Sequence, residues 1–147
     1  MVITKIEAQK KKGRYNIYLN DAFAFGVDEA TVVKYALFKG TELTKDQIKE
    51  IQQDDCIQQA YQKALHFLNF KLRSTKEVYE KLEKLEFDDD IINEVLGKLH
   101  EQNFINDTFY GESYLNQAKF VTFKGPKSIV FDLQKKGISD KVIQTVL

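Results

Sequence analysis

Several classes of protein are excluded by residues that this sequence uses sparingly. One cysteine, Cys56, cannot form an internal disulfide framework or a cysteine-rich zinc site. One proline and seven glycines are too few for a turn-rich β-sandwich or β-barrel. No apolar run approaches the roughly 18 residues of a membrane span, and residues 1–12 lack the apolar segment of a signal peptide. We therefore expect a cytoplasmic protein without membrane contact.

Residue patterns that support catalysis or metal binding are also missing. The histidines His66 and His100 belong to different predicted helices and lack the i, i+4 spacing of a metal pair. The acidic run at residues 88–90 is compatible with magnesium, but helix capping explains it better, because carboxylates suit a helix N-terminus. Gly-rich phosphate loops and G-x-S-x-G motifs are absent. We expect no enzyme activity, no cofactor, no metal and no small-molecule substrate.

Charge is balanced overall but uneven along the chain. The 22 basic and 22 acidic side chains cancel, so the net charge indicates no polyanionic partner. Residues 56–108 carry seven basic and ten acidic side chains, whereas residues 109–147 carry six and three. A basic cluster, residues 10–12 with Lys5 and Arg14, surrounds a predicted hairpin tip. This cluster is either an ordinary solvated tip or a local phosphate contact.

Residues 1–55 predict a small α+β module. Short stretches rich in β-branched and alternating apolar residues, at 2–9, 14–19 and 23–27, predict three strands. Tight turns separate them, which favours a three-stranded antiparallel meander. A three-stranded sheet covered by helices has a thin core by itself, so we expect this module to dock on the part of the chain that follows.

Two helices are predicted after the strands. Asp28 stands where an N-cap is expected for a helix over residues 29–38, and Gly40 is placed to end that helix. Thr44 and Gln47 have the spacing of a capping box, which predicts the start of the next helix.

From residue 56 the apolar period changes to 3.6, and the rest of the chain predicts tandem three-helix repeats over 56–105 and 106–147. The two repeats align at an offset of 51 residues, as from Ser74 to Gly125. The other aligned pairs are Thr75/Pro126, Val78/Ile129, Leu82/Leu133, Phe87/Ile138, Ile91/Val142, Ile92/Ile143, Val95/Val146 and Leu96/Leu147. The predicted fold is therefore mainly α, with repeats that follow the α+β module.

Basic side chains gather near equivalent helix corners of the two repeats. These candidate contact residues are Lys71, Arg73 and Lys76 in the first repeat and Lys119, Lys124, Lys127, Lys135 and Lys136 in the second. A repeat array presents equivalent corners along one edge, so these side chains either form a basic stripe or are ordinary surface lysines. The sequence alone does not decide between these two interpretations.

Four ordered motifs make the sequence similar to the RecX family, the regulators of the RecA recombinase. The first comprises I-T-K-I-E at residues 3–7, K-G-R-Y-N-I-Y-L at 12–19 and F-A-F-G-V at 23–27. L-R-S-x-K-E-V at residues 72–78 resembles the first-repeat signature, and F-I-N-D-x-x-F-like residues 104–110 resemble the junction between repeats. K-G-P-x-x-I-x-x-x-L-x-x-K-G-I at residues 124–138 resembles the second-repeat signature.

This resemblance implies a protein that binds along the RecA filament on single-stranded DNA and modulates, mainly by inhibition, its ATPase and strand exchange. It implies a role in recombination, DNA repair and the SOS response. The partner it names is the RecA filament, and single-stranded DNA stays open as a second partner. The eight basic residues are the candidates for contact. Family members carry at least three repeats, whereas this sequence stops at Leu147 after the second, so we expect a fragment.

A DNA-binding protein of helix-turn-helix type is the alternative, because three-helix units often house that motif. The connection at residues 86–90 is short enough. The helix predicted after it is acidic at Asp90, Glu94 and Glu101, and a recognition helix that faces phosphates is expected to be basic.

Overall fold

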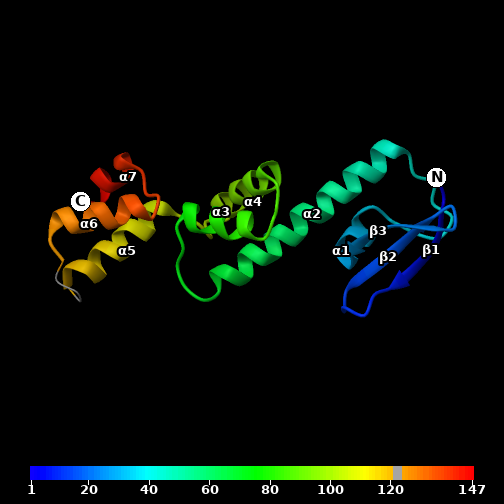
Figure 1. The fold of residues 1–147 in the computed structure, drawn as a ribbon, viewed down its shortest axis with the longest axis horizontal. Helices are drawn as coiled ribbons and strands as arrows, with labels where there is room; N and C mark the ends of the chain where they lie inside the picture. The colour runs from blue at the N-terminus through cyan, green and yellow to red at the C-terminus, as the bar shows by residue number, and fades with distance from the viewer. Residues whose placement is uncertain (121–123) are drawn as a thin grey trace. The chain divides into compact units, whose positions relative to one another are not determined.

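The computed structural model describes residues 1–120 and 124–147 of the chain, which form two compact units, Met1–Gln59 and Ala60–Leu147. Helices dominate, and a three-stranded antiparallel sheet opens the chain, so the predicted fold class is confirmed (Figure 1). The strands are β1 (Ile3–Ala8), β2 (Arg14–Leu19) and β3 (Ala22–Asp28). The helices among the described residues are α1 (Glu29–Lys34), α2 (Lys45–Leu68), α3 (Thr75–Lys84), α4 (Asp89–Glu101), α5 (Asp107–Phe120), α6 (Pro126–Lys135) and α7 (Asp140–Val146).

The sheet has the strand order β1-β2-β3 with antiparallel pairs, which confirms the predicted meander. Successive side chains of a strand point to opposite faces. On one face, Ile17 and Leu19 of the central strand are buried together with Phe25 and Val27 of β3. Ile51 of α2 packs into the same core, so α2 covers that face of the sheet.

The helix that follows the sheet is shorter than predicted. Asp28 occupies the N-cap position of α1, but its side chain makes no capping hydrogen bond and accepts one from Arg14 at 2.9 Å instead. A hydrogen bond from the charged guanidinium is stronger than one from a backbone N–H, which explains why Asp28 contacts Arg14 and does not cap the helix. The helix ends at Lys34, because the chain then turns to bury Leu37 in the core. Gly40, the predicted helix end, lies in a later turn with φ of 95°.

The next helix begins where the sequence predicts. The Thr44 N–H donates to Gln47 Oε1 at 2.8 Å, and the Gln47 N–H donates to Thr44 Oγ1 at 3.2 Å, which is the predicted capping box. α2 continues to Leu68 and so runs through the predicted boundary between the module (1–55) and the first repeat (56–105). No glycine or proline interrupts this stretch, so the change in apolar pattern reflects a new buried face of one helix.

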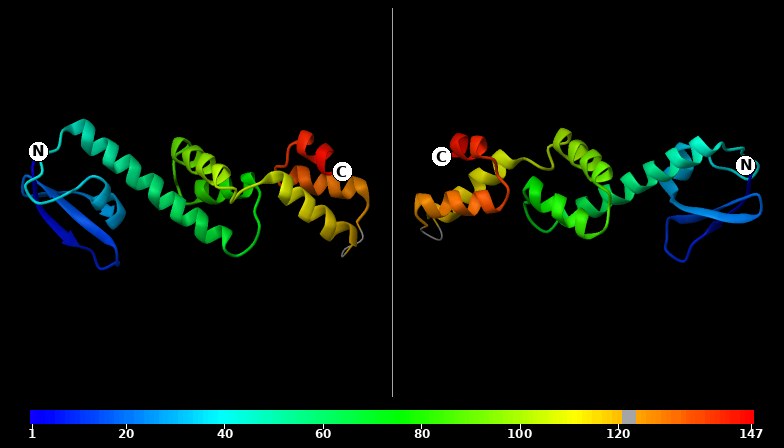
Figure 2. Two further views of the ribbon diagram at one scale, coloured as in Figure 1. Left: turned by 180° about the vertical axis from the view of Figure 1, so that it is seen from behind. Right: turned by 45° about the horizontal axis from the view of Figure 1, so that its top comes forward.

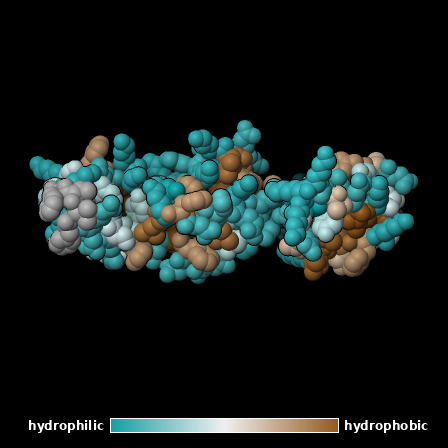
Figure 3. All heavy atoms as spheres, turned by 90° about the horizontal axis from the view of Figure 1, so that it is seen from below, coloured by the Kyte–Doolittle hydropathy of each residue, from teal (hydrophilic) through white to brown (hydrophobic). Residues whose placement is uncertain are grey.

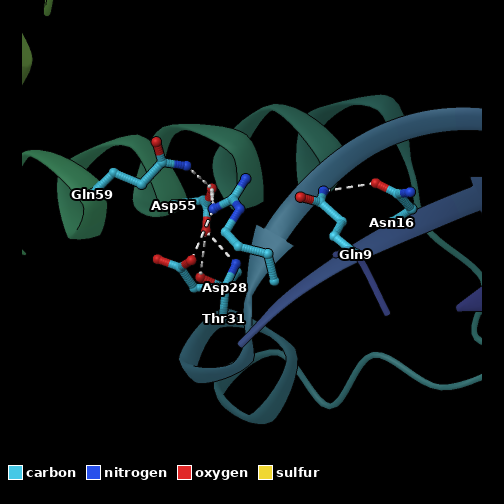
Figure 4. A network of polar contacts seen from close by, with 7 residues as sticks. Gln9, Asn16, Asp28, Thr31, Asp55 and Gln59 are labelled. Atoms are coloured by element: carbon cyan, nitrogen blue, oxygen red, sulfur yellow. Dashed lines mark hydrogen bonds and ion pairs between the residues drawn. The ribbon is translucent and has the colours of Figure 1, made fainter. Parts of the chain in front are cut away.

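A buried carboxylate ties α2 to the sheet and to α1 (Figure 4). Asp55 is only 4% exposed. Its oxygens accept from Arg14 Nη1 at 3.1 Å, the Asp28 N–H at 2.8 Å, the Thr31 hydroxyl at 3.1 Å and Gln59 Nε2 at 2.8 Å. With four partners this carboxylate is well compensated for its burial.

The helix bounds of the first repeat (56–105) and the second repeat (106–147) follow the predicted duplication. α3 and α6 differ by 51 residues at both ends, and α4 and α7 by 51 at their starts. Figure 2 shows α3 beside α4, and α6 beside α5 and α7. Three aligned pairs are buried: Val78/Ile129, Leu82/Leu133 and Ile92/Ile143. The aligned pair Leu96/Leu147 differs in burial, because Leu96 is buried whereas Leu147 is 57% exposed.

Candidate interaction site at the junction of the two repeats

The start of α3 contacts the end of α6. Ser74, the buried N-cap of α3, accepts from the Glu77 N–H at 3.2 Å, and Glu77 Oε1 accepts from the Ser74 N–H at 3.0 Å. This reciprocal pair is a capping box. The same Ser74 hydroxyl donates to the carbonyl of Lys136 at 2.8 Å. The residue that caps α3 therefore also holds the second repeat in place.

A glycine permits close approach at this contact. Gly137 has φ of +86°, and a Cβ atom added there would lie 2.4 Å from Cβ of Lys76. Such a contact is too short, so the Lys76 stem requires the bare glycine backbone. The Lys76 ammonium extends onward and donates to the carbonyl of Lys135 at 3.3 Å.

A third contact joins the starts of α3 and α5. Asp107 Oδ1 accepts from the Thr75 N–H at 2.8 Å and from the Thr75 hydroxyl at 3.0 Å. One carboxylate thus satisfies an otherwise unpaired N–H group at the α3 N-terminus. The motifs at residues 72–78, 104–110 and 124–138 consequently meet in space at one junction.

Two pockets at this junction collect most of the predicted basic residues. The first measures about 350 Å³ and is lined by Lys76, Glu77, Glu80, Tyr114, Lys124, Asp132, Lys135 and Lys136. The second measures about 280 Å³ and is lined by Lys71, Leu72, Tyr110, Ser113, Tyr114, Gln117 and Lys136. Tyr114 and Lys136 belong to both, so the pockets adjoin. Five of the eight candidate contact residues thereby share one surface, which we call the junction surface.

Carboxylates restrain several lysines of the junction surface. Lys124 lies 2.7 Å from Asp132, whose carboxylate also accepts from the Tyr114 hydroxyl at 2.6 Å. These two hydrogen bonds hold the pKa of Asp132 below its ordinary value. Lys136 and Glu77 approach to 3.7 Å.

The pKa of Glu77 is also lowered. Burial alone would raise it, but the hydrogen bond from the Ser74 backbone, the Tyr110 hydroxyl and the charges of Lys136 and Arg73 together outweigh burial. The ionised carboxylate of Glu77 is therefore part of the folded junction.

The other basic candidates differ in their surroundings. The Arg73 guanidinium lies 3.9 Å from the ring centre of Phe67, and its buried Nε has no partner among the described residues. Lys71, Lys127 and Lys135 form no ion pair with any carboxylate in the described ranges. Lys119 is exposed and, like Lys127, lies outside both pockets.

The basic side chains meet for a reason that differs from the predicted one. Lys76 of the first repeat and Lys135 of the second lie together because the α6 end docks on the α3 start. They do not occupy equivalent positions of their repeats, since the residue equivalent to Lys76 is Lys127. Equivalent corners therefore did not produce this grouping, and the role of its lysines in binding stays a prediction.

Acidic and aromatic partners of these lysines were not singled out from the sequence. Glu77 was open to prediction, because Ser74 and Glu77 have capping-box spacing. No local pattern indicates that Tyr114 contacts Asp132, 18 residues away, or that Asp107 caps Thr75.

The described residues hold no group of three or more His, Cys, Asp or Glu side chains suited to a metal ion. His100 Nε2 lies 3.2 Å from the Thr75 hydroxyl, and His66 packs against the ring of Phe70. Within the described ranges, no helix is both long and apolar enough to span a membrane. On the face drawn in Figure 3, apolar side chains form separate patches with hydrophilic ones around them.

Comparison with known proteins gives consistent matches along the chain. Residues 1–44 match the family model for the regulatory protein RecX N-terminal domain, and residues 60–99 match the model for the RecX first three-helix domain. The regulatory protein RecX of Leuconostoc mesenteroides is 43% identical over 99% of this chain, and that of Bacillus velezensis is 40% identical over 99%. The chain spans 54% and 56% of these two relatives, which is about half their length.

Solved structures resemble the chain as well. A crystal structure of regulatory protein RecX has a TM-score of 0.80 to this chain at 38% sequence identity. The match covers 99% of this chain and 72% of the chain in that structure. A crystal structure of RecX from Lactobacillus salivarius has a TM-score of 0.62 at 40% identity, covering 64% of this chain and 61% of its own.

Proposed function

The chain belongs to the RecX family of regulatory proteins, and from that premise we propose that it binds the RecA–single-stranded DNA filament and regulates homologous recombination. The observation that carries the proposal is the 38% identity to a solved regulatory protein RecX over 99% of the chain, at a TM-score of 0.80. The regulation is mainly inhibitory and lowers the ATPase and strand-exchange activities of the filament. It acts through binding and requires no catalytic group of this chain.

The junction surface is the part of the chain that we assign to filament contact. A filament groove is lined by protein and by DNA phosphates, so a complementary surface needs both fixed shape and positive charge. The ion pairs of Lys124 with Asp132 and of Lys136 with Glu77 favour fixed shape. Lys71 and Lys135 add positive charge and form no ion pair in the described ranges, although the charge of Lys135 helps to lower the pKa of Asp132.

The test uses variants that reverse charge without breaking an internal ion pair. We expect the double variant Lys71→Glu/Lys135→Glu to bind RecA filaments about tenfold or more weakly, because two favourable contacts become repulsive. Lys124 is a poor choice for reversal, since a new carboxylate there would face Asp132. Filament binding is measured by anisotropy, and ATP hydrolysis by RecA is measured in the same samples.

Lys141→Glu is the matched control. This residue lies in the first turn of α7, outside both pockets, where an acidic side chain is compatible with the helix dipole. Equal inhibition by the parent and the double variant contradicts the junction surface. A parent that neither binds the filament nor lowers its ATPase contradicts the proposed function itself.

The helix-turn-helix alternative has less support. The exposed side of α4 carries Asp89, Asp90 and Glu94, and the Tyr79 hydroxyl donates to Asp89 at 2.5 Å. A helix with this acidic surface is repelled by duplex phosphates.

A further inference from the structure

Within the described residues, one face of the sheet in the first unit, which we call the open face, carries no residue of the hydrophobic core. The core of this unit lies on the face that carries Ile17 and Leu19, against α2. On the other face, Asn16 and Tyr18 belong to the central strand and are nonetheless only half-buried. The side chains of Gln9 and Arg14 lie over Gly26 at one end of this open face, whereas Tyr18 lies beside Lys5 and Phe23 at the other end.

Aromatic and cationic side chains form a row across this open face. Register pairs Lys5 of β1 with Tyr18 of β2, and Tyr18 with Phe23 of β3, and paired residues share a face. The Lys5 ammonium lies 5.3 Å from the Tyr18 ring centre, and the rings of Tyr18 and Phe23 meet edge to face at 5.9 Å. Phe23 is 59% exposed, so most of its ring is available to a ligand.

Positive charge gathers at the hairpin tip at the other end of β2. Lys10, Lys11 and Lys12 are all exposed, and none of them pairs with a carboxylate among the described residues. The tip and the aromatic row are separated by the four-residue step from Arg14 to Tyr18. At about 3.3 Å per residue this is about 13 Å, so one short single strand reaches both.

We propose that the open face of this sheet binds single-stranded nucleic acid, with bases stacked on Phe23 and Tyr18 and phosphates held by Lys5 and the lysines of the hairpin tip. Stacking on aromatic side chains and neutralisation of phosphates are the two interactions by which proteins hold single strands without sequence preference. Duplex DNA does not fit, because its bases are already stacked and paired. This site goes beyond the filament contact assigned above and requires no RecA.

One acidic residue opposes this binding. Glu7 pairs with Lys5 at 2.9 Å and lies on the same face. Its charge repels a phosphate and competes for the Lys5 ammonium. Removal of that charge in Glu7→Gln is therefore expected to strengthen binding several-fold, which a merely structural role for the Lys5–Glu7 pair does not predict.

The experiment titrates the full chain against a labelled oligothymidylate at low salt and follows anisotropy. We expect Phe23→Ala to weaken binding about tenfold, since one stacked base is lost. The double variant Lys11→Glu/Lys12→Glu is expected to weaken binding at least as much and to reduce the salt dependence. Phe38→Ala and Lys49→Glu are matched controls, because Phe38 is 65% exposed and Lys49 is an exposed lysine of α2, both outside the sheet.

Circular dichroism checks that each variant keeps the fold of the parent. Absence of oligothymidylate binding by the parent overturns this site and leaves the filament proposal standing. Equal losses in Phe23→Ala and Phe38→Ala, or equal affinity for duplex DNA, also overturn it. If the sheet variants lose filament binding but keep oligothymidylate binding, the face contacts protein and the assignment to nucleic acid is wrong.

Discussion

Glu86 and Gly137 occupy the same place in the two repeats, and both have a left-handed backbone, with φ of 70° and 86°. Glycine adopts this conformation without strain, whereas a residue with a Cβ atom is strained in it. Backbone bonds repeat as well: the Phe87 N–H donates to the Leu82 carbonyl, as the Ile138 N–H does to the Leu133 carbonyl. The same backbone hydrogen bond therefore ends α3 and α6, and it forms with either glutamate or glycine in the left-handed position. The backbone strain is larger for Glu86 than for Gly137.

Gly137→Ala is expected to destabilise the chain. The added Cβ is strained at this φ by about 1–2 kcal/mol and also requires the Lys76 stem to move. Urea unfolding measures the loss. Gly97→Ala is the control, since Gly97 lies within α4 and an added Cβ meets nothing within 4 Å there. Equal midpoints for the two variants would contradict a special role for Gly137.

Glu86→Gly is expected to act in the opposite direction. Relief of the left-handed strain outweighs the extra freedom of glycine in the unfolded chain, so we expect a gain of about 0.5–1 kcal/mol. Thermal unfolding measures this gain. A lower melting temperature would show that the Glu86 backbone is not strained.

Glu77 makes the junction sensitive to acid. Its pKa is lowered in the folded chain, so its contribution to stability is present above the ordinary value of 4.5 and is lost as pH falls below it. We expect Glu77→Gln to be less stable than the parent at neutral pH, with the difference shrinking in acid. Urea midpoints between about pH 7 and pH 3 measure this. A difference that is independent of pH would mean that the charge of Glu77 does not stabilise the junction.

At the scale of elements, one buried side chain secures α2 to the sheet. Asp55→Ala leaves the Asp28 N–H and the Thr31 hydroxyl without their acceptor, and Arg14 keeps its contact with Asp28. A buried donor that loses its acceptor costs about 1–3 kcal/mol. We expect the loss to appear in the first unit, and hydrogen exchange of β2 and β3 amides localises it. Unchanged protection of these amides would contradict the anchoring role.

The repeat helices depend on equivalent leucines. Leu82 and Leu133 are both fully buried at 0% exposure, so Leu→Ala at either is expected to cost about 2–5 kcal/mol. Denaturant midpoints for the two single variants check the equivalence. An unmoved midpoint in either variant would mean that its helix is not packed as described.

At the scale of the whole molecule, charge acts locally. Basic and acidic side chains number 22 each, so no long-range field steers the chain toward DNA. We expect filament binding to weaken with salt, but less steeply than for a protein held by phosphates alone. Affinities between about 50 and 200 mM salt give the slope. Lys135→Ala is expected to lower that slope by about one if this lysine contacts a phosphate.

Several features of the molecule could be predicted from the sequence because they depend on neighbouring residues. The three strands follow from local apolar alternation and turn residues, and the start of α2 follows from Thr44 and Gln47. The helix bounds of the repeats follow from apolar periods that recur at a fixed offset. The candidate lysines were named from the sequence and their role in binding stays a prediction, whereas their ion pairs could not be predicted.

Other features were decided only by the tertiary structure, because they join residues distant in the chain. α1 ends early so that Leu37 reaches the core, and Asp28 contacts Arg14 instead of capping the helix. The junction surface depends on Ser74 and Lys136, which are 62 residues apart. Local periodicity determines which residues form a helix and which side is apolar, but it carries no information on which helix ends will meet. Packing determines which ends meet: the Lys76 side chain fits against the Gly137 backbone, and the Ser74 hydroxyl donates to the Lys136 carbonyl.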